Sequence, residues 1–260
     1  MRLSVEWKGS RYEAQLGAAI DLSLPVDFAG EQPTFFGLPA ARQVAIEAGD
    51  FVGDTQRGGG CNCRQLILCP HGNGTHTESY QHVTADAPAP AQVLDAALMT
   101  AQVITVSSTT LSQSAEHYSS WGQPDDRVIS CAAIKAAIDG ADCPESVILR
   151  TRPNGGAKRY ANYDQEWAPY LTYEAIDWLH QSGLKHLIVD LPSIDRHDDG
   201  GELPNHHRFW GALGARATLT ELAYIPDEVD DGLYLLNLQL PHLLTDAVPS
   251  RPVLIPLLER

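Results

Sequence analysis

Between residues 101 and 190 the chain alternates β-branched segments with segments of helical periodicity. Residues 101–107 (AQVITVS) and 146–151 (SVILRT) have the apolar, β-branched composition of buried strands. Residues 129–138, between them, carry apolar side chains at helical spacing, and Gly140 is expected to end that helix. Such alternation is typical of β-α-β units. The sequence therefore predicts a mixed α/β fold with a β-α-β centre.

A second helix and a following strand extend this pattern. Thr172 is suited to cap the start of a helix, because apolar residues follow it at helical spacing from Ala175 to Leu179. Gly183 is suited to end the same helix. Residues 187–190 (LIVD) then have the composition of another buried strand.

Further strands are expected to flank this centre. Residues 217–225 and 232–240 have strand composition and are separated by the acidic turn 226–231, so an antiparallel hairpin is the natural interpretation. Two shorter strands are expected at residues 19–25 and 65–69.

Length and charge limit the domain organisation and the partners. The 260 residues, 43% of them hydrophobic, suffice for one large core and are few for two, so we expect a single domain over residues 1–260. The formal net charge of -15 would repel phosphate backbones and anionic lipid surfaces. Nucleic acid and membrane partners are therefore not expected, and a small-molecule substrate is.

The chain carries no sign of export or membrane insertion. No apolar run approaches the roughly 18 to 20 residues of a membrane span. The first residues, MRLSVEWKGSRYEAQ, lack the apolar core and the cleavage site of a signal peptide. We expect a cytoplasmic protein.

The five cysteines do not predict a disulfide framework. Cys61, Cys63 and Cys69 lie in one stretch, while Cys131 and Cys143 lie far downstream. The C-x-C-x5-C spacing differs from the paired C-x2-C of zinc ribbons, so we interpret these residues as small buried side chains.

The strongest local signal is a polar, histidine-rich loop at residues 71–82 (HGNGTHTESYQH). It contains three imidazoles and a carboxylate, and its two glycines allow a tight backbone. His76 and Glu78 are two residues apart, so they share one face of an extended segment. A His and a carboxylate on one face suit a divalent ion such as Zn2+ or Mn2+.

One short loop seldom completes a coordination sphere, so further ligands should come from elsewhere in the chain. The candidates are His206, His207 and Glu221. The alternative interpretation of the loop is a polar surface segment without a site.

Asp190, Ser193 and Asp195 follow a predicted strand, where α/β proteins often place functional side chains, but these are also ordinary turn residues. We leave them outside the predicted site. A serine hydrolase is not expected, because the chain has no G-x-S-x-G motif.

The histidine segment resembles the H-x-G-T-H-x-D-x-P-x-H signature of the metal-dependent cyclase family, which includes bacterial kynurenine formamidases and isatin hydrolases. Other segments of the chain are also similar to that family: Ile20-Asp21-Leu22-Ser23, Leu149-Arg150-Thr151, Pro169 to Gly183, His186 to Asp195 (HLIVDLPSID), Asp199-Gly200-Gly201, His206-x-x-Phe209-Trp210, Thr220-Glu221-Leu222 and Tyr234 to Leu240. The resemblance covers nearly the whole chain. It implies the α/β fold of that family, a single-domain swivelling β/β/α arrangement.

The resemblance also implies roles for individual residues. The matching metal ligands are His71, His76, Glu78, His206 and Glu221. His82 matches the residue that serves the family as acid and base. His207 is adjacent to His206, and spacing alone does not exclude it as the ligand.

By the same resemblance, the implied activity is metal-dependent hydrolysis of a non-peptide C–N bond, in an aryl formamide or a cyclic amide. A divalent ion would supply a nucleophile from water and polarise the carbonyl, while His82 would move the proton to the leaving nitrogen. The alternatives are a metal-dependent lyase or isomerase and an inactive metal-binding member of the family. A homodimer or homotetramer is also implied.

Three departures from the family pattern bear on the site. His71 and His76 are spaced H-x4-H instead of H-x3-H, Glu78 stands where Asp is usual, and Tyr80 replaces proline. Glu is about one methylene longer than Asp. The number of bound ions, one or two, therefore stays open.

Overall fold

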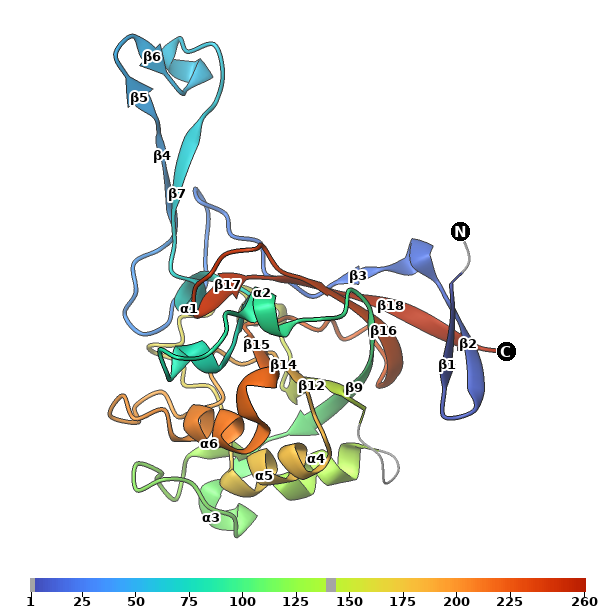
Figure 1. The fold of residues 1–260 in the computed structure, drawn as a ribbon. Coiled ribbons are helices and arrows are strands. Elements are labelled where there is room, and N and C mark those ends of the chain that lie inside the picture. The colour runs from blue at the N-terminus through green and yellow to red at the C-terminus, as the bar shows by residue number, and fades with distance from the viewer. Residues whose placement is uncertain (1–2, 139–143) are drawn as a thin grey trace.

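The computed structural model describes residues 3–138 and 144–260, and its largest element is a curved sheet that runs through the whole molecule (Figure 1). The strands of this sheet are β1 (Ser4–Trp7), β2 (Ser10–Ala14), β3 (Ile20–Asp21), β8 (His76–Glu78), β9 (Met99–Ser107), β12 (Ser146–Arg152), β14 (His186–Val189), β15 (Thr218–Glu221), β16 (Gly232–Gln239), β17 (Ala247–Pro249) and β18 (Arg251–Glu259). They are ordered β1-β2-β18-β16-β9-β12-β14-β15-β8-β17, and β3 pairs with β18.

The centre of the sheet consists of the parallel strands β9, β12, β14 and β15. Successive side chains of β12 enter two different cores, with Val147 and Leu149 on one face and Ile148 on the other. Burial on both faces explains the nearly continuous apolar composition of these strands. The strands predicted at 101–107, 146–151 and 187–190 are confirmed.

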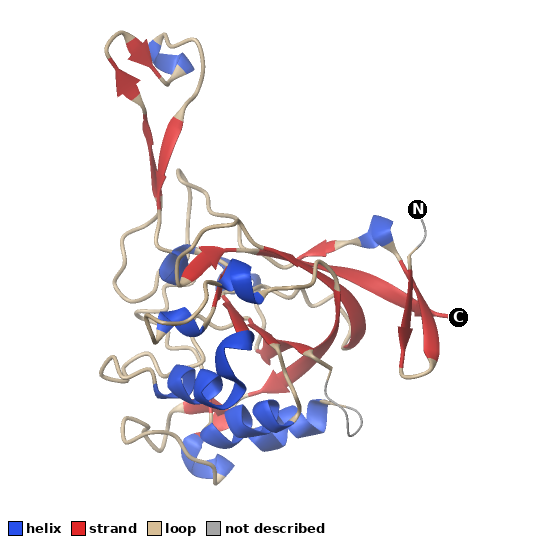
Figure 2. Ribbon diagram, viewed as in Figure 1, coloured by secondary structure: helices blue, strands red, loops and turns tan. Residues whose placement is uncertain are grey.

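Helices cover one face of these parallel strands (Figure 2). They are α4 (Cys131–Ala137), α5 (Tyr173–Gln181) and α6 (Pro204–Leu213). Thr172 caps α5 as predicted, because its hydroxyl accepts a hydrogen bond from the backbone N–H of Ala175. Ile134, Ile176 and Trp210 are fully buried against the sheet. Burying each such side chain is worth about 1.5–3 kcal/mol.

The mixed α/β class and the β-α-β centre are therefore confirmed. The shorter helices are α1 (Pro70–Asn73), α2 (Pro90–Val93) and α3 (Leu111–Ser114), and a small separate sheet holds β10 (Thr109–Thr110), β11 (Arg127–Ile129) and β13 (Tyr170–Leu171). Gly140, the predicted end of the 129–138 helix, lies outside the described residues.

The predicted hairpin of residues 217–225 and 232–240 is wrong. Strand β15 lies between β14 and β8, while β16 lies between β9 and β18. The connecting segment carries the buried side chains of Leu222, Ile225 and Val229, so it packs against the body instead of forming a tight turn. The strand predicted at 19–25 shrinks to β3.

The histidine-rich segment is not a surface loop. Residues 76–78 form β8, which pairs with β15 on one side and β17 on the other. His76, Thr77 and Glu78 are all fully buried. Polar composition concealed this strand, because its three buried side chains are polar and leave no hydrophobic pattern.

A two-stranded arm rises from the body near α1 (Figure 1). Strands β4 (Arg42–Ala45) and β7 (Arg64–Ile67) form its stem, and β5 (Glu47–Ala48) pairs with β6 (Phe51–Val52) toward its tip. Of the strands in this arm, only β7 was predicted, as the strand at 65–69. Val44, Phe51 and Leu66 on the arm are exposed, with Leu66 at 55%.

The interpretation of the cysteines as buried side chains is confirmed for Cys131 and wrong for Cys61 and Cys63, while Cys69 is partly buried. Cys61, Cys63, Cys69 and Cys131 are free thiols, and Cys61 and Cys63 are exposed on the arm. Cys143 lies outside the described residues. Among the residues that the structure describes, no helix has the length and apolar character needed to cross a bilayer.

Candidate metal centre

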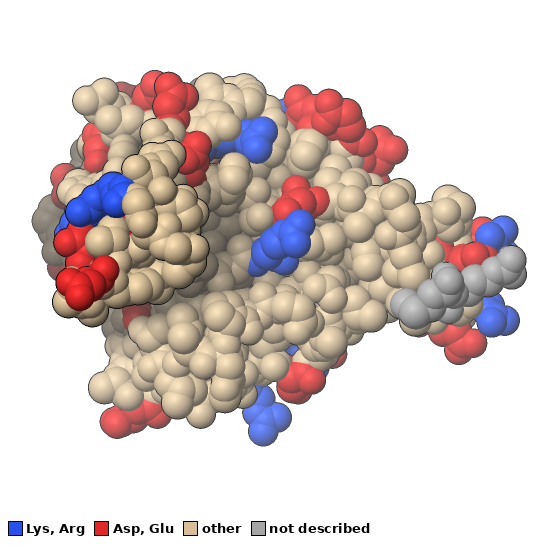
Figure 3. Space-filling view, turned by 90° about the horizontal axis from the view of Figure 1, so that it is seen from above, with Lys and Arg blue, Asp and Glu red and all other residues tan. Residues whose placement is uncertain are grey.

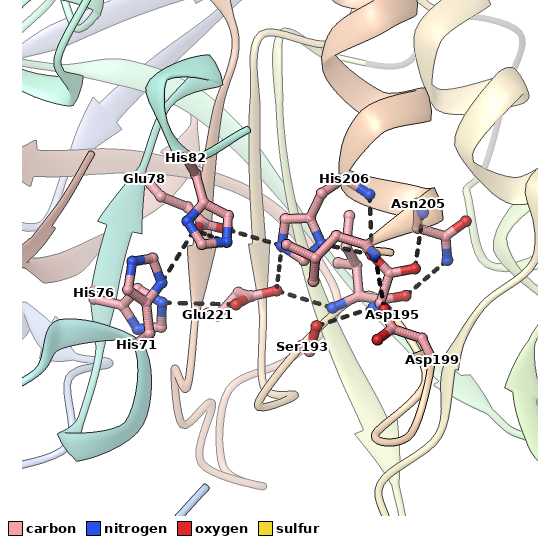
Figure 4. Close-up of polar contacts among 12 residues, drawn as sticks. His71, His76, Glu78, His82, Ser193, Asp195, Asp199, Asn205, His206 and Glu221 are labelled. Atoms are coloured by element: carbon pink, nitrogen blue, oxygen red, sulfur yellow. Dashed lines mark hydrogen bonds and ion pairs between the residues drawn. The ribbon is translucent and has the colours of Figure 1, made fainter. Parts of the chain in front are cut away.

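Six residues predicted from the sequence converge at one point of the large sheet (Figure 4). Strand β8 holds His76 and Glu78, and Glu221 is the last residue of β15. His206 lies in the first turn of α6, His71 lies in α1, and His82 ends the short 3-10 helix η3 (Tyr80–His82). They are His71, His76, Glu78, His82, His206 and Glu221. His207, the alternative to His206, is exposed.

The pairing of β8 explains why His76 and Glu78 meet Glu221. Glu221 is paired with His76 in the β15–β8 register, and Thr77, between the two ligand candidates, hydrogen-bonds Thr220 instead. His71, in α1, reaches the same point, because its Nδ1 lies 3.3 Å from Oε2 of Glu78.

Nitrogen and carboxylate donors alternate across the cluster. Nε2 of His206 lies 3.0 Å from Oε1 of Glu78 and 3.6 Å from Oε1 of Glu221. Nε2 of His76 lies 3.6 Å from Oε2 of Glu221, and Nδ1 of His71 lies 3.3 Å from Oε2 of Glu78. The longer side chain at position 78 therefore still reaches imidazoles on both sides.

The donor set fits a divalent metal ion. Nδ1 of His76 lies 3.0 Å from the carbonyl oxygen of Gly74 and donates its proton there, so Nε2 carries the lone pair. That Nε2 atom is buried and has no hydrogen-bond partner among the described residues. A buried, unpartnered nitrogen facing carboxylates is costly unless a cation completes it. Imidazole and carboxylate donors suit borderline divalent ions.

The carboxylates and imidazoles of the cluster change one another's pKa values. Burial alone would raise the pKa of Glu78, but the adjacent His206 outweighs burial and holds that pKa well below its usual range. Burial likewise opposes protonation of His71, yet Glu78 and Asp246 raise its pKa to about 9. Without metal, His71 is therefore protonated at neutral pH, and a proton on Nδ1 has to leave before that atom can bind an ion.

His82 differs from the other imidazoles. Burial lowers its pKa, so its neutral form is favoured near neutral pH. Its Nε2 lies 3.8 Å from Oε2 of Glu78, and its side chain is 20% exposed, compared with 0% for His76. A neutral imidazole at the open side of the cluster can accept a proton from water.

Asp195, weighed from the sequence but left out of the predicted site, holds His206 in place. Its Oδ2 accepts a hydrogen bond of 2.6 Å from Nδ1 of His206, which leaves Nε2 free to face the cluster. The same carboxylate accepts the backbone N–H groups of Asn205 and His206, so it caps the start of α6. Asp190 lies apart and pairs with Lys158 at 2.7 Å.

Asp246, just before β17, was not predicted at all. Its carboxylate contacts both His71 and His82. Nothing local in the sequence distinguishes it from an ordinary turn residue beside Thr245. Its proximity to the histidines is created only by the pairing of β17 with β8.

The sequence is similar to a family model and to curated enzymes. Residues 20–196 match the Cyclase family model. A kynurenine formamidase from Bacillus cytotoxicus is 30% identical over 115 residues, which are 44% of this chain and 50% of that relative. The chain thus spans half the length of this curated relative.

Solved structures resemble the whole fold. Isatin hydrolase A from Labrenzia aggregata aligns with a TM-score of 0.59 and 17% identity, over 91% of this chain and 93% of that one. A protein described as a predicted metal-dependent hydrolase from Bacillus stearothermophilus aligns with a TM-score of 0.59 and 16% identity, over 91% and 97%. At these identities the likeness concerns the fold.

Proposed function

Because the chain belongs to the Cyclase family, we propose that it is a metal-dependent hydrolase of a C–N amide bond. The observation that carries this proposal is the buried, unpartnered Nε2 of His76 facing the carboxylate of Glu221. The kynurenine formamidase and isatin hydrolase relatives support an amide substrate. The substrate class we propose is an aryl formamide or a cyclic amide.

We propose that five residues of the cluster bind metal and that the sixth, His82, transfers protons. His71, His76, Glu78, His206 and Glu221 would hold one or two divalent ions, either Zn2+ or Mn2+. When bound, the ion would supply a nucleophile from water at neutral pH and polarise the substrate carbonyl.

His82 would then act as base and acid. Its neutral imidazole lies at the open side of the cluster and would accept the proton of the attacking water. The same imidazolium would return that proton to the leaving nitrogen. Asp195 would keep Nε2 of His206 turned toward the ion throughout, because its hydrogen bond fixes the opposite nitrogen of that ring.

The activity can be tested with a small panel of amides. Protein loaded with Zn2+ or Mn2+ is expected to hydrolyse at least one of N-formylaniline, N-formylated aminobenzoyl compounds or isatin, and chelation is expected to stop it. In water enriched in oxygen-18, one labelled oxygen should enter the carboxylate product.

Two results would contradict hydrolysis. One is the absence of turnover of every amide by protein with a full metal complement, which would favour an inactive metal-binding protein. The other is conversion of a carbonyl compound with solvent deuterium in the product and no net addition of water, which would identify a lyase or isomerase.

For the quaternary structure we propose a homodimer or homotetramer built through the arm. A two-stranded ribbon is marginally stable alone, and apolar side chains such as Leu66 lie exposed on it. Beside the arm the molecule is hollowed, and few Lys, Arg, Asp or Glu side chains line this part of the face (Figure 3), so little charge opposes the approach of a second chain there.

Sedimentation equilibrium is expected to give two or four chains per particle, and Leu66→Asp should shift the particle toward the monomer. An equivalent charge at exposed Leu258, on β18, is the matched control. A monomeric wild-type protein would refute the proposal.

A further inference from the structure

Asp246 lies at the open side of the histidine cluster. Its side chain is 40% exposed, whereas that of Glu78 is fully buried. One oxygen of Asp246, Oδ2, lies 2.8 Å from Nε2 of His71 and 3.3 Å from Nδ1 of His82. A single carboxylate oxygen therefore contacts two imidazoles to which the proposed function gives different roles.

Both imidazoles are held between an inner and an outer carboxylate. The rings of His71 and His82 are stacked, with centroids 4.3 Å apart and planes 30° from parallel. Nδ1 of His71 and Nε2 of His82 face Oε2 of Glu78 at 3.3 Å and 3.8 Å. The opposite nitrogen of each ring faces Asp246.

This arrangement determines which ring nitrogens carry protons. A neutral imidazole has one N–H donor and one lone pair, and an ionised carboxylate can only accept. The Asp246 side chain is 40% exposed, and its Oδ2 lies 2.8 Å from Nε2 of His71 and 3.3 Å from Nδ1 of His82, within reach of a proton from each. Nε2 of His71 and Nδ1 of His82 must then be the donors. Once the proton on Nδ1 of His71 has left, as metal binding requires, the lone pairs lie on Nδ1 of His71 and Nε2 of His82, the two atoms that face the cluster.

We infer that Asp246 is a positioning residue that selects the tautomers of His71 and His82 together. It would present Nδ1 of His71 as a metal donor and Nε2 of His82 as the proton acceptor. This inference rests on the proposed function for the roles of the two histidines. The tautomers themselves are measurable without any substrate.

The test is long-range proton–nitrogen NMR on the full chain loaded with Zn2+, which is diamagnetic. The wild type is expected to show a proton on Nδ1 of His82 and on Nε2 of His71. In Asp246→Asn the amide N–H2 group competes as a donor, so at least one of the two rings should change tautomer. Asp246→Glu keeps the carboxylate and should retain the wild-type pattern in both rings.

Affinity and kinetics supply a second readout. Asp246→Asn is expected to weaken Zn2+ binding by about 10–100-fold, as loss of a carboxylate behind a ligating imidazole does. At saturating Zn2+, kcat should fall about 10²–10⁴-fold with KM nearly unchanged, because the base is lost and not the binding site. Asp227→Asn removes an exposed carboxylate that pairs with Arg152 and is the matched control.

Three results would overturn the inference. They are a wild-type His82 protonated on Nε2, tautomers unchanged in Asp246→Asn, and the loss of a whole zinc equivalent in that variant, which would make Asp246 a metal ligand. Failure of the proposed function looks different. Expected tautomers and zinc affinities in a protein that hydrolyses no amide would preserve the role of Asp246 and refute the hydrolase.

Discussion

Replacing His76 by alanine is expected to lower the metal content from about one or two divalent ions per chain to a small residual fraction, and to abolish amide hydrolysis. His76 is fully buried, and its Nε2 has no hydrogen-bond partner among the described residues. Alanine removes this donor and leaves Glu221 facing a void. The remaining donors lack this central imidazole and would hold an ion far more weakly.

Plasma mass spectrometry on untagged, dialysed protein measures the stoichiometry, and titration with Zn2+ measures the affinity. His242→Ala is the matched control, because His242 is exposed and contributes nothing to the cluster. Circular dichroism should give the same spectrum for both variants. Unchanged metal content in His76→Ala, or a wild-type protein that takes up neither Zn2+ nor Mn2+, would contradict the metal site.

The second large effect is expected at His82, where alanine should leave the metal content unchanged but reduce kcat by about 10²–10⁴-fold. The ring of His82 is partly exposed at the side of the cluster that opens to solvent, and burial favours its neutral form. Its removal therefore takes away a proton acceptor without taking away one of the inner donors.

The measurement pairs metal analysis with steady-state kinetics on whichever amide the wild type hydrolyses. Added imidazole should restore part of kcat in His82→Ala, because a small base can occupy the vacated volume. If metal and turnover disappear together, His82 is a ligand and another group moves the proton. Wild-type kcat in the variant would exclude His82 from the chemistry.

Much of the fold was predictable because the central strands are buried on both faces. The apolar run of residues 146–151 and the Thr172 cap are local signals, and local signals survive in the folded chain. The pairing of strands is not local. Residues 217–225 and 232–240 are close in sequence, yet each strand pairs with partners from other parts of the chain.

The residues of the candidate site likewise differ in whether local sequence signals identify them. His71, His76, Glu78 and His82 were predicted because they occur in one short segment with metal-ligand chemistry, and the resemblance to a family matched two further candidates, His206 and Glu221, to its ligands. Asp195 and Asp246 support these residues through hydrogen bonds. The position of Asp195 after a strand was a signal too weak to separate it from a turn residue, and Asp246 had no local signal, because only the pairing of β17 with β8 brings it to the histidines.

The position of β8 between β15 and β17 affects the order in which the molecule can assemble. During synthesis His76 and Glu78 emerge early, but the strands that flank them, ending at Glu221 and beginning at Ala247, are made more than a hundred residues later. Contacts so distant along the chain form slowly, because a long loop has to close first. The donors therefore come together only late in folding, so a nascent chain has little affinity for metal. A divalent ion held by these donors would then stabilise the finished sheet.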